Sequence, residues 1–119
     1  MIVGIDVDGV CDYVPAIIRS ICADPTHTIH IITYRDECDR EETKEMLKDL
    51  GIRFDSLHMP EDGVRMEDWK RKVVIDNKVE LMIEDTPEIL AVLPPHVARI
   101  WVTDPSVYDL DKAISGMKS

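Results

Sequence analysis

The sequence predicts an α/β fold, a three-layer α/β/α sandwich around a mainly parallel, five-stranded, Rossmann-like sheet. Short apolar runs rich in β-branched residues alternate along the chain with segments whose apolar residues recur at helical spacing. Acidic or hydroxyl residues end several of the apolar runs. This alternation, with right-handed crossovers, places helices on both faces of a parallel sheet. The length of 119 residues fits one domain, spanning residues 1–119.

The first part of the chain predicts two strands and two helices. Residues 2–7 form an apolar run that ends in acidic residues, which predicts a buried parallel strand. Residues 13–23 carry apolar side chains at helical spacing and are followed by Pro25, which predicts an amphipathic helix. Residues 29–33 predict the second strand. The buried stripe of the next helix consists of Thr43, Met46, Leu47 and Leu50, and Gly51 provides a C-terminal cap.

The middle of the chain predicts a third strand and a third helix. Residues 54–59 give a weaker strand pattern, and residues 60–66 form a polar loop. The helix that follows has Trp69, Val73 and Val74 on its inner face.

The last part predicts two more strands and two helices. Residues 81–83 form a buried strand, and Thr86-Pro87-Glu88 marks a helix start with a hydroxyl cap, a proline in the first turn and an acid near the positive end of the dipole. Residues 99–102 predict the fifth strand. Asp104-Pro105 predicts a turn into a terminal helix with its apolar stripe at Val107, Leu110 and Ile114.

Composition excludes several classes of function. The chain has 14 basic and 24 acidic residues, a net charge of −10, so we expect no broad nucleic-acid-binding surface, although a nucleic-acid end could still be bound locally. The odd number of cysteines, without paired spacing, predicts neither a disulfide framework nor a zinc site. Without a basic leader or a membrane-spanning apolar run, the protein is predicted to be cytoplasmic and not bound to membranes. The oligomeric state is left open.

Polar residues at the predicted strand ends form a candidate site. Asp6 and Asp8 follow the first strand, and two carboxylates held close together favour a neutralising cation such as Mg²⁺. An isolated pair of this kind is a weak signal. Thr33 ends the second strand, Lys70 opens a helix, and Glu84 and Asp85 end the fourth strand, where ligands of open α/β sheets bind.

These residues carry a resemblance to the haloacid dehalogenase superfamily that covers nearly the whole chain. Ile5-Asp6-Val7-Asp8-Gly9-Val10 resembles its first motif, Ile31-Ile32-Thr33-Tyr34-Arg35 its second, and Met82-Ile83-Glu84-Asp85-Thr86 its fourth. Lys70 lies where compact nucleotidase-like members place the lysine of the third motif, with Lys72 as the competing candidate. The stretch from Leu57 to Lys70 is also similar to the phosphatase domain of polynucleotide kinase-phosphatases.

The resemblance implies a Mg²⁺-dependent phosphatase. In that scheme Asp6 is the nucleophile that forms an aspartyl-phosphate, Asp8 is the general acid and base, and Thr33 and Lys70 stabilise the transferred phosphoryl group. Tyr34 and Arg35 add substrate contacts. The metal would be bound by Asp6, the backbone carbonyl of Asp8, Glu84 and Asp85, with Asp85 as the preferred direct ligand. Glu84, at a place where relatives more often have Asp, would bind the metal through water or orient Asp85.

The resemblance also implies a capless enzyme with an open site, because the segments after the first and third strands are too short for an inserted domain. The substrate is expected to be a phosphorylated small molecule, such as a nucleotide, or a nucleic-acid 3′-phosphate end. Two alternatives remain: a non-catalytic phosphate-binding or assembly module with the same fold, and a receiver-like signalling domain.

Overall fold

The computed structural model describes residues 1–103 and contains one sheet of five strands in the order β3-β2-β1-β4-β5. The strands are β1 (Ile2–Ile5), β2 (Thr28–Ile32), β3 (Ser56–His58), β4 (Leu81–Glu84) and β5 (Ala98–Trp101). Every neighbouring pair is parallel, so the predicted α/β class is confirmed. The order is that of a Rossmann-type sheet, whereas receiver domains have the flavodoxin-like order 2-1-3-4-5. The receiver-like alternative is therefore wrong.

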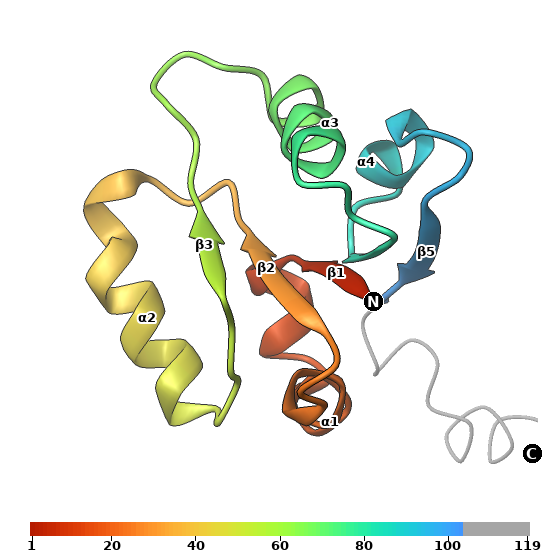
Figure 1. Cartoon of the computed structure of the whole chain (residues 1–119). Coiled ribbons are helices and arrows are strands. Elements are labelled where there is room, and N and C mark those ends of the chain that lie inside the picture. The colour runs from red at the N-terminus through yellow and green to blue at the C-terminus, as the bar shows by residue number, and fades with distance from the viewer. Residues whose placement is uncertain (104–119) are drawn as a thin grey trace, which may run out of the picture.

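Helices cover both faces of the sheet, as Figure 1 shows. They are α1 (Pro15–Ala23), α2 (Arg40–Asp49), α3 (Met66–Asp76) and α4 (Pro87–Val92), with short irregular turns at η1 (Val7–Cys11) and η2 (Glu37–Asp39). Helices α1 and α2 lie on one face, and α3 and α4 lie on the other. The connections in residues 1–103 leave no room for a cap domain.

Alternation along the central strands divides the core in two. On the α1 and α2 side, Ile5, Ile29 and Ile31 belong to a buried cluster with Ile18 and Leu47 of the helices. On the opposite side, the cluster consists of Ile32, Val73, Val74, Val79, Met82, Leu90, Leu93 and Val97. Successive side chains of a strand point to opposite faces, so these strands are buried on both faces and read as nearly continuous apolar runs.

Several predicted boundaries differ from the structure. Strand β1 ends at Ile5, before the predicted end at residue 7, because the backbone turns after Asp6 and Gly9 adopts a positive φ of 79°. Thr86 occupies the N-cap of α4, but the predicted hydroxyl cap is absent. Its Oγ1 donates instead to Oδ1 of Asp85 at 3.1 Å. The predicted turn at Asp104 and the terminal helix after it lie outside the described residues.

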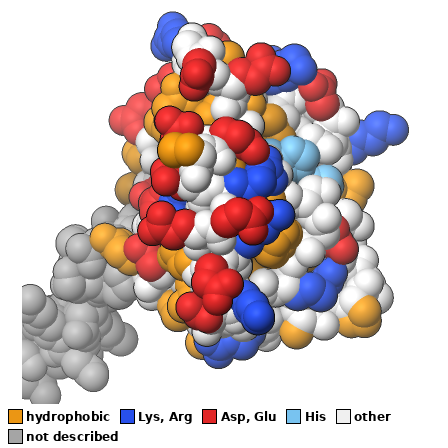
Figure 2. Space-filling model, turned by 90° about the vertical axis from the view of Figure 1, so that its left-hand side faces the viewer, with side chains coloured by type: hydrophobic (Ala, Val, Ile, Leu, Met, Phe, Trp, Pro, Cys, Tyr) orange, Lys and Arg blue, Asp and Glu red, His pale blue; other side chains and the backbone are white. Residues whose placement is uncertain are grey.

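The surface over α2 and β3 carries mixed charges. Figure 2 shows acidic and basic side chains interspersed on this face, without a continuous basic area. Such a surface does not have the extended positive potential that non-specific nucleic-acid binding requires. In residues 1–103, none of the helices combines the length and the apolar character needed to cross a lipid bilayer.

Gly4, in the central strand, provides the first test of this packing. A Cβ added at Gly4 would lie 2.8 Å from Sδ of Met82 and 3.1 Å from Cδ1 of Ile32. We expect Gly4→Val to lower the free energy of unfolding by about 1–3 kcal/mol because it overpacks the core. Urea denaturation would measure the change. Ala98→Val adds two of the same three carbons at an exposed strand position and should change stability far less; equal effects of the two substitutions would contradict the packing described here.

Candidate active site

The predicted site residues meet where the strand order reverses. Strands β1 and β4 are adjacent, but the chain leaves them toward opposite sides of the sheet, from β1 to β2 and from β4 to β5. Ligands of open α/β sheets bind beyond the carboxyl ends of such a pair. Asp6 directly follows β1, and its N–H donates to the carbonyl of Ile83 in β4 at 3.0 Å. A pocket of about 410 Å³ opens here, lined by Asp6, Asp8, Tyr34, Arg35, Met66, Lys70, Asp85 and Thr86.

A buried group of three ionisable side chains lies at the base of the pocket, which two of them, Asp6 and Lys70, line. Nζ of Lys70 lies 3.0 Å from Oδ1 of Asp6 and 2.8 Å from Oε2 of Glu84. The exposed fractions are 2% for Lys70, 5% for Asp6 and 0% for Glu84. Lys70 lies on the same face of α3 as Val73 and Val74, so the apolar packing of that helix directs the lysine inward. We call these three residues the buried trio.

The competing lysine is in a different environment. The side chain of Lys72 is 75% exposed, and its Nζ lies 2.8 Å from Oδ2 of Asp76 on the same helix. Lys70, not Lys72, is therefore the lysine that the structure brings to the site.

Burial governs the titration of Asp6. Loss of solvation raises the pKa of Asp6, the attraction of Lys70 opposes this change, and the nearby Glu84 raises it further, with a resulting pKa of about 8. For Lys70, burial disfavours the charge, but the attraction of Asp6 and Glu84 outweighs burial, so the pKa of Lys70 is raised. Near neutral pH, the Asp6 carboxyl is therefore mainly protonated and Lys70 is charged.

Glu84 holds Asp85 in place. Its Oε1 accepts hydrogen bonds from the backbone N–H groups of Asp85 at 3.2 Å and Thr86 at 3.4 Å, while Oε2 accepts from Lys70. The Asp85 carbonyl also accepts a hydrogen bond from Nε1 of Trp101 at 3.1 Å. The chain after β4 is therefore fixed from both sides.

Three carboxylates could hold a metal ion. One oxygen each from Asp6, Glu84 and Asp85 lies within 4.8 Å of the others. Because both oxygens of Glu84 already accept hydrogen bonds, Asp6 and Asp85 are better placed as direct ligands. The predicted ligand on Asp8 is its backbone carbonyl. Among the described residues, the side-chain carboxylate of Asp8 does not belong to this cluster.

Gly9 makes room for Asp85. A Cβ at Gly9 would lie 2.1 Å from Oδ2 of Asp85, and the φ of 79° is a conformation that favours glycine. No other residue fits this position without moving the carboxylate.

Asp8 and Arg35 form a second ion pair at the mouth of the pocket. Nε and Nη2 of Arg35 donate to the two oxygens of Asp8 at 3.0 and 2.8 Å, and Nη1 donates to Oγ1 of Thr43 at 3.1 Å. The hydrogen bonds from Arg35 hold the pKa of Asp8 below its usual range. The repulsion between Asp6 and Asp8 is thus relieved by two separate side-chain cations, Lys70 and Arg35, which the sequence argument for a metal did not anticipate.

The other predicted residues lie around this centre. Thr33 is buried at the end of β2, and its Oγ1 accepts a hydrogen bond from the N–H of Arg35 at 3.3 Å. Tyr34 is 43% exposed on the wall of the pocket, and its hydroxyl donates to the carbonyl of Val64. Met66 and Thr86 also line the pocket, although neither is among the predicted site residues. The place of Thr86 beside Asp85 is the sequence signal that points to it.

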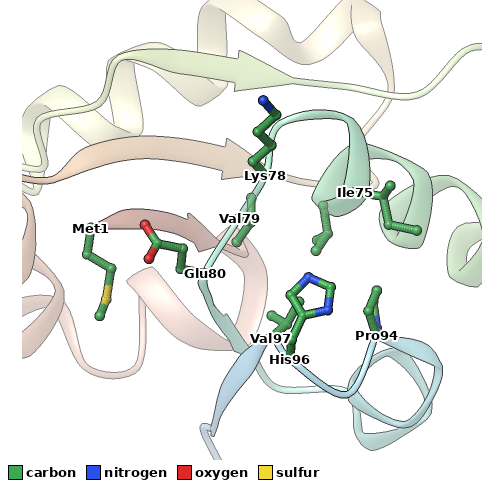
Figure 3. Close-up of a pocket in the computed structure, with 9 residues that line it drawn as sticks. Met1, Ile75, Lys78, Val79, Glu80, Pro94, His96 and Val97 are labelled. Atoms are coloured by element: carbon green, nitrogen blue, oxygen red, sulfur yellow. The ribbon is translucent and has the colours of Figure 1, made fainter.

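Another cavity, of about 450 Å³, lies at the amino ends of β1, β4 and β5, away from the candidate site. Its wall is mainly apolar and includes Lys78, Glu80 and His96, as Figure 3 shows. It contains none of the predicted site residues, and Glu80 is already engaged as the acceptor of a 3.0 Å hydrogen bond from the N–H of Ile2.

Comparison with known proteins supports the fold. No protein-family model matches the chain, and no curated protein sequence matches it. Among solved structures, the chain is similar to a chain of the Pnkp1/Rnl/Hen1 complex, with a TM-score of 0.72 and 15% sequence identity. The similarity covers 85% of this chain and 45% of that chain. This chain therefore matches less than half of that larger protein, and at such low identity the likeness shows a shared fold.

Removal of the Lys70 ammonium group tests the ion pairs of the buried trio. Lys70→Met would leave Asp6 and Glu84 buried without their partner, so we expect the free energy of unfolding at pH 7 to fall by about 3–5 kcal/mol. Lys72→Met removes an exposed lysine from the same helix and should leave stability close to that of the wild type. Urea denaturation of both variants would measure the difference. Equal stability of the two variants would be incompatible with the ion pairs described for Lys70.

Metal binding should depend on the proton of Asp6. Because the pKa of Asp6 is raised to about 8, the carboxyl group is mainly protonated below that pH and must lose its proton to bind a cation. We expect Mg²⁺ binding to tighten as the pH rises from 6 to 8, by up to about tenfold per pH unit. Isothermal titration calorimetry over this range would measure both affinity and proton release. Affinity that stays constant with pH would remove Asp6 from the ligand set.

Proposed function

We propose that this protein is a Mg²⁺-dependent phosphomonoester hydrolase that forms an aspartyl-phosphate on Asp6. The main support is the meeting of Asp6, Lys70, Glu84 and Asp85 beside an open pocket at the strand-order reversal. The resemblance of the sequence motifs to the haloacid dehalogenase superfamily supports the same reaction. The fold shared with a chain of the Pnkp1/Rnl/Hen1 complex agrees with the predicted similarity to polynucleotide kinase-phosphatases.

The first step uses Asp6 as nucleophile. Its carboxylate oxygen attacks the phosphorus, a new O–P bond forms, and the bond to the leaving alcohol breaks. In the second step, water attacks the aspartyl-phosphate, which releases phosphate and restores the carboxylate. Lys70, 3.0 Å from Asp6, offsets negative charge on the nucleophile and the phosphoryl group during both steps.

Asp8 supplies and recovers the proton. It protonates the leaving alcohol in the first step and takes a proton from water in the second. Arg35 holds the pKa of Asp8 low, which favours the ionised form. An incoming phosphate dianion competes for Arg35, and loss of those hydrogen bonds lets the pKa of Asp8 rise. In this way substrate binding prepares Asp8 to act as an acid.

The carboxylate cluster suits a hard divalent cation. Asp6 and Asp85 would hold Mg²⁺ together with the carbonyl of Asp8, and Glu84 would orient Asp85. When bound, Mg²⁺ would shield the anionic nucleophile from the anionic phosphate. Thr33 and the backbone N–H groups near it would orient the phosphoryl oxygens.

The open pocket favours a substrate whose body extends into solvent. Arg35 on its wall would bind the phosphate, and Tyr34 would contact the group next to it. We propose nucleotides or nucleic-acid 3′-phosphate ends as the substrate class. The net charge of −10 makes local recognition of a single terminal phosphate more favourable than binding along a polyanion.

Phosphate release provides the direct test. The substrates would be nucleoside monophosphates, 3′-phosphorylated oligonucleotides and sugar phosphates, each with Mg²⁺ and with a chelator. Turnover that requires Mg²⁺ and is fastest on one of the nucleotide substrates would support the proposal. Phosphate binding without turnover would instead support a non-catalytic phosphate-binding module.

Substitution of the nucleophile tests the mechanism. Asp6→Asn removes the attacking oxygen and should lower phosphate release at least about 10³-fold, while a folded domain is retained. Asp68→Asn, on the exposed face of α3, is the matched control and should keep wild-type activity. Circular dichroism would verify the fold of both variants. Comparable turnover by Asp6→Asn would defeat the covalent mechanism.

A further inference from the structure

Thr43 on α2 is a buried polar residue that contacts the candidate site through Arg35. Its exposed fraction is 0%, and it lies on the same face of α2 as Leu47, which packs in the core. Helix α2 lies beside β3, on the same face of the sheet as α1 (Figure 1). The packing of this helix therefore fixes where the Thr43 hydroxyl lies relative to the end of β2.

The hydrogen bonds of Thr43 leave its hydroxyl oxygen as an acceptor. Oγ1 donates its only proton to the carbonyl of Asp39, four residues earlier in the chain, at 2.8 Å. The oxygen can therefore only accept from Arg35, whose Nη1 donates to it at 3.1 Å. Sδ of Met46, also on α2, accepts a weaker hydrogen bond from Nη2 of Arg35 at 3.5 Å. Thr43 and Met46 thus provide a fixed contact for one side of the guanidinium.

The other edge of the guanidinium faces Asp8. Nε and Nη2 of Arg35 donate to the two carboxylate oxygens of Asp8 at 3.0 and 2.8 Å. This edge has the two parallel N–H groups that bind a carboxylate or a phosphate in bidentate fashion. Nη1, which is bound to Thr43, does not belong to this edge. The bidentate edge can therefore exchange Asp8 for a phosphate while the hydrogen bond to Thr43 stays in place.

Other carboxylates near Arg35 compete with the pocket for its guanidinium. The hydrogen bonds to Asp8 are the main cause of the raised pKa of Arg35, and the attraction of Glu42 and Asp39 raises it further. A long arginine side chain without a fixed contact would divide its time among such partners, and this freedom would be lost again when a phosphate binds. The hydrogen bond to Thr43 restricts that freedom before the phosphate arrives.

We propose that Thr43 is a positioning residue, which holds the guanidinium of Arg35 at the pocket while its bidentate edge exchanges Asp8 for the phosphate of the substrate. This inference rests on the proposed function because it places a phosphate in the pocket, but it does not require that the phosphate be hydrolysed. Among residues 1–103, the residues that line the pocket include none from α2. The inference thus adds α2 to the elements on which phosphate binding depends.

Binding of inorganic phosphate to the full chain in the presence of Mg²⁺ tests this role. Thr43→Val keeps the shape of the side chain but removes the acceptor, so we expect phosphate affinity to fall about tenfold, as for the loss of a hydrogen bond to a charged group. Thr43→Ser keeps the hydroxyl and should restore nearly the affinity of the wild type. Thr28→Val makes the same substitution at an exposed position in β2 and should leave affinity unchanged. Isothermal titration calorimetry would measure each affinity.

A double-mutant cycle separates action through Arg35 from a general effect on stability. Arg35→Ala removes the guanidinium, so the addition of Thr43→Val to this variant should lower phosphate affinity no further. Titrations followed by ³¹P NMR would extend the measurement to weak binding. Additive losses in the double variant would overturn the proposal. A Thr43→Val variant that has a lower Tm but keeps the phosphate affinity of the wild type would also overturn it.

Turnover distinguishes this inference from the proposed function. Where phosphate is released, Thr43→Val should raise KM about tenfold and leave kcat nearly unchanged, because the hydrogen bond to Arg35 is made in the ground state and the transition state alike. An unchanged KM would overturn the role of Thr43 and leave the phosphatase function intact. Phosphate binding without turnover would overturn only the phosphatase function, and the affinities would still test Thr43. A wild-type protein that binds no phosphate would overturn both.

Discussion

The burial of Asp6, Lys70 and Glu84 at the edge of a parallel sheet is the constraint on which the candidate site depends. Charges removed from water are tolerated only with partners at hydrogen-bond distance, and here each of the three side chains comes from a different segment. One ammonium between two carboxyl groups leaves an excess of negative charge. Burial raises the pKa of Asp6, the excess charge raises it further, and the excess also makes the base of the pocket receptive to a cation.

The buried trio and the Asp8–Arg35 ion pair differ in how readily they can change partners. The buried trio is enclosed and fixed by its neighbours, whereas the Asp8 carboxylate is 62% exposed and bound to a guanidinium that also contacts Thr43. Surface pairs contribute little to stability and rearrange readily. The inner residues are thus suited to holding a fixed geometry, and the outer pair is suited to changing partners when an anion arrives.

The fold could be predicted from the sequence because the spacing of apolar residues distinguishes strands from helices, and acidic or hydroxyl residues mark the ends of several strands. The sequence favours Lys70 over Lys72 because of its spacing from Glu84, and in the structure Lys70 is the buried lysine beside Asp6 and Glu84, whereas Lys72 is exposed. The pairing of Asp8 with Arg35 could not be predicted, because it depends on how the turn after β1 faces the end of β2. The early end of β1 was missed because Val7 continues the apolar pattern although the backbone has already turned. The Thr86 hydroxyl was misassigned because its bond to Asp85 depends on how the turn after β4 places that carboxylate.

The central position of β1 affects how the protein forms during synthesis. Asp6 leaves the ribosome first, but Lys70 and Glu84 follow only after most of residues 1–103 have been translated. Until then, β1 can pair with β2 but not with β4, and Asp6 lacks both partners of the buried trio. Domains generally fold as units during translation, and here completion of the unit coincides with assembly of the charged base of the pocket. A chain that has been translated only to the end of α3 lacks Glu84 and therefore cannot form this arrangement of charges.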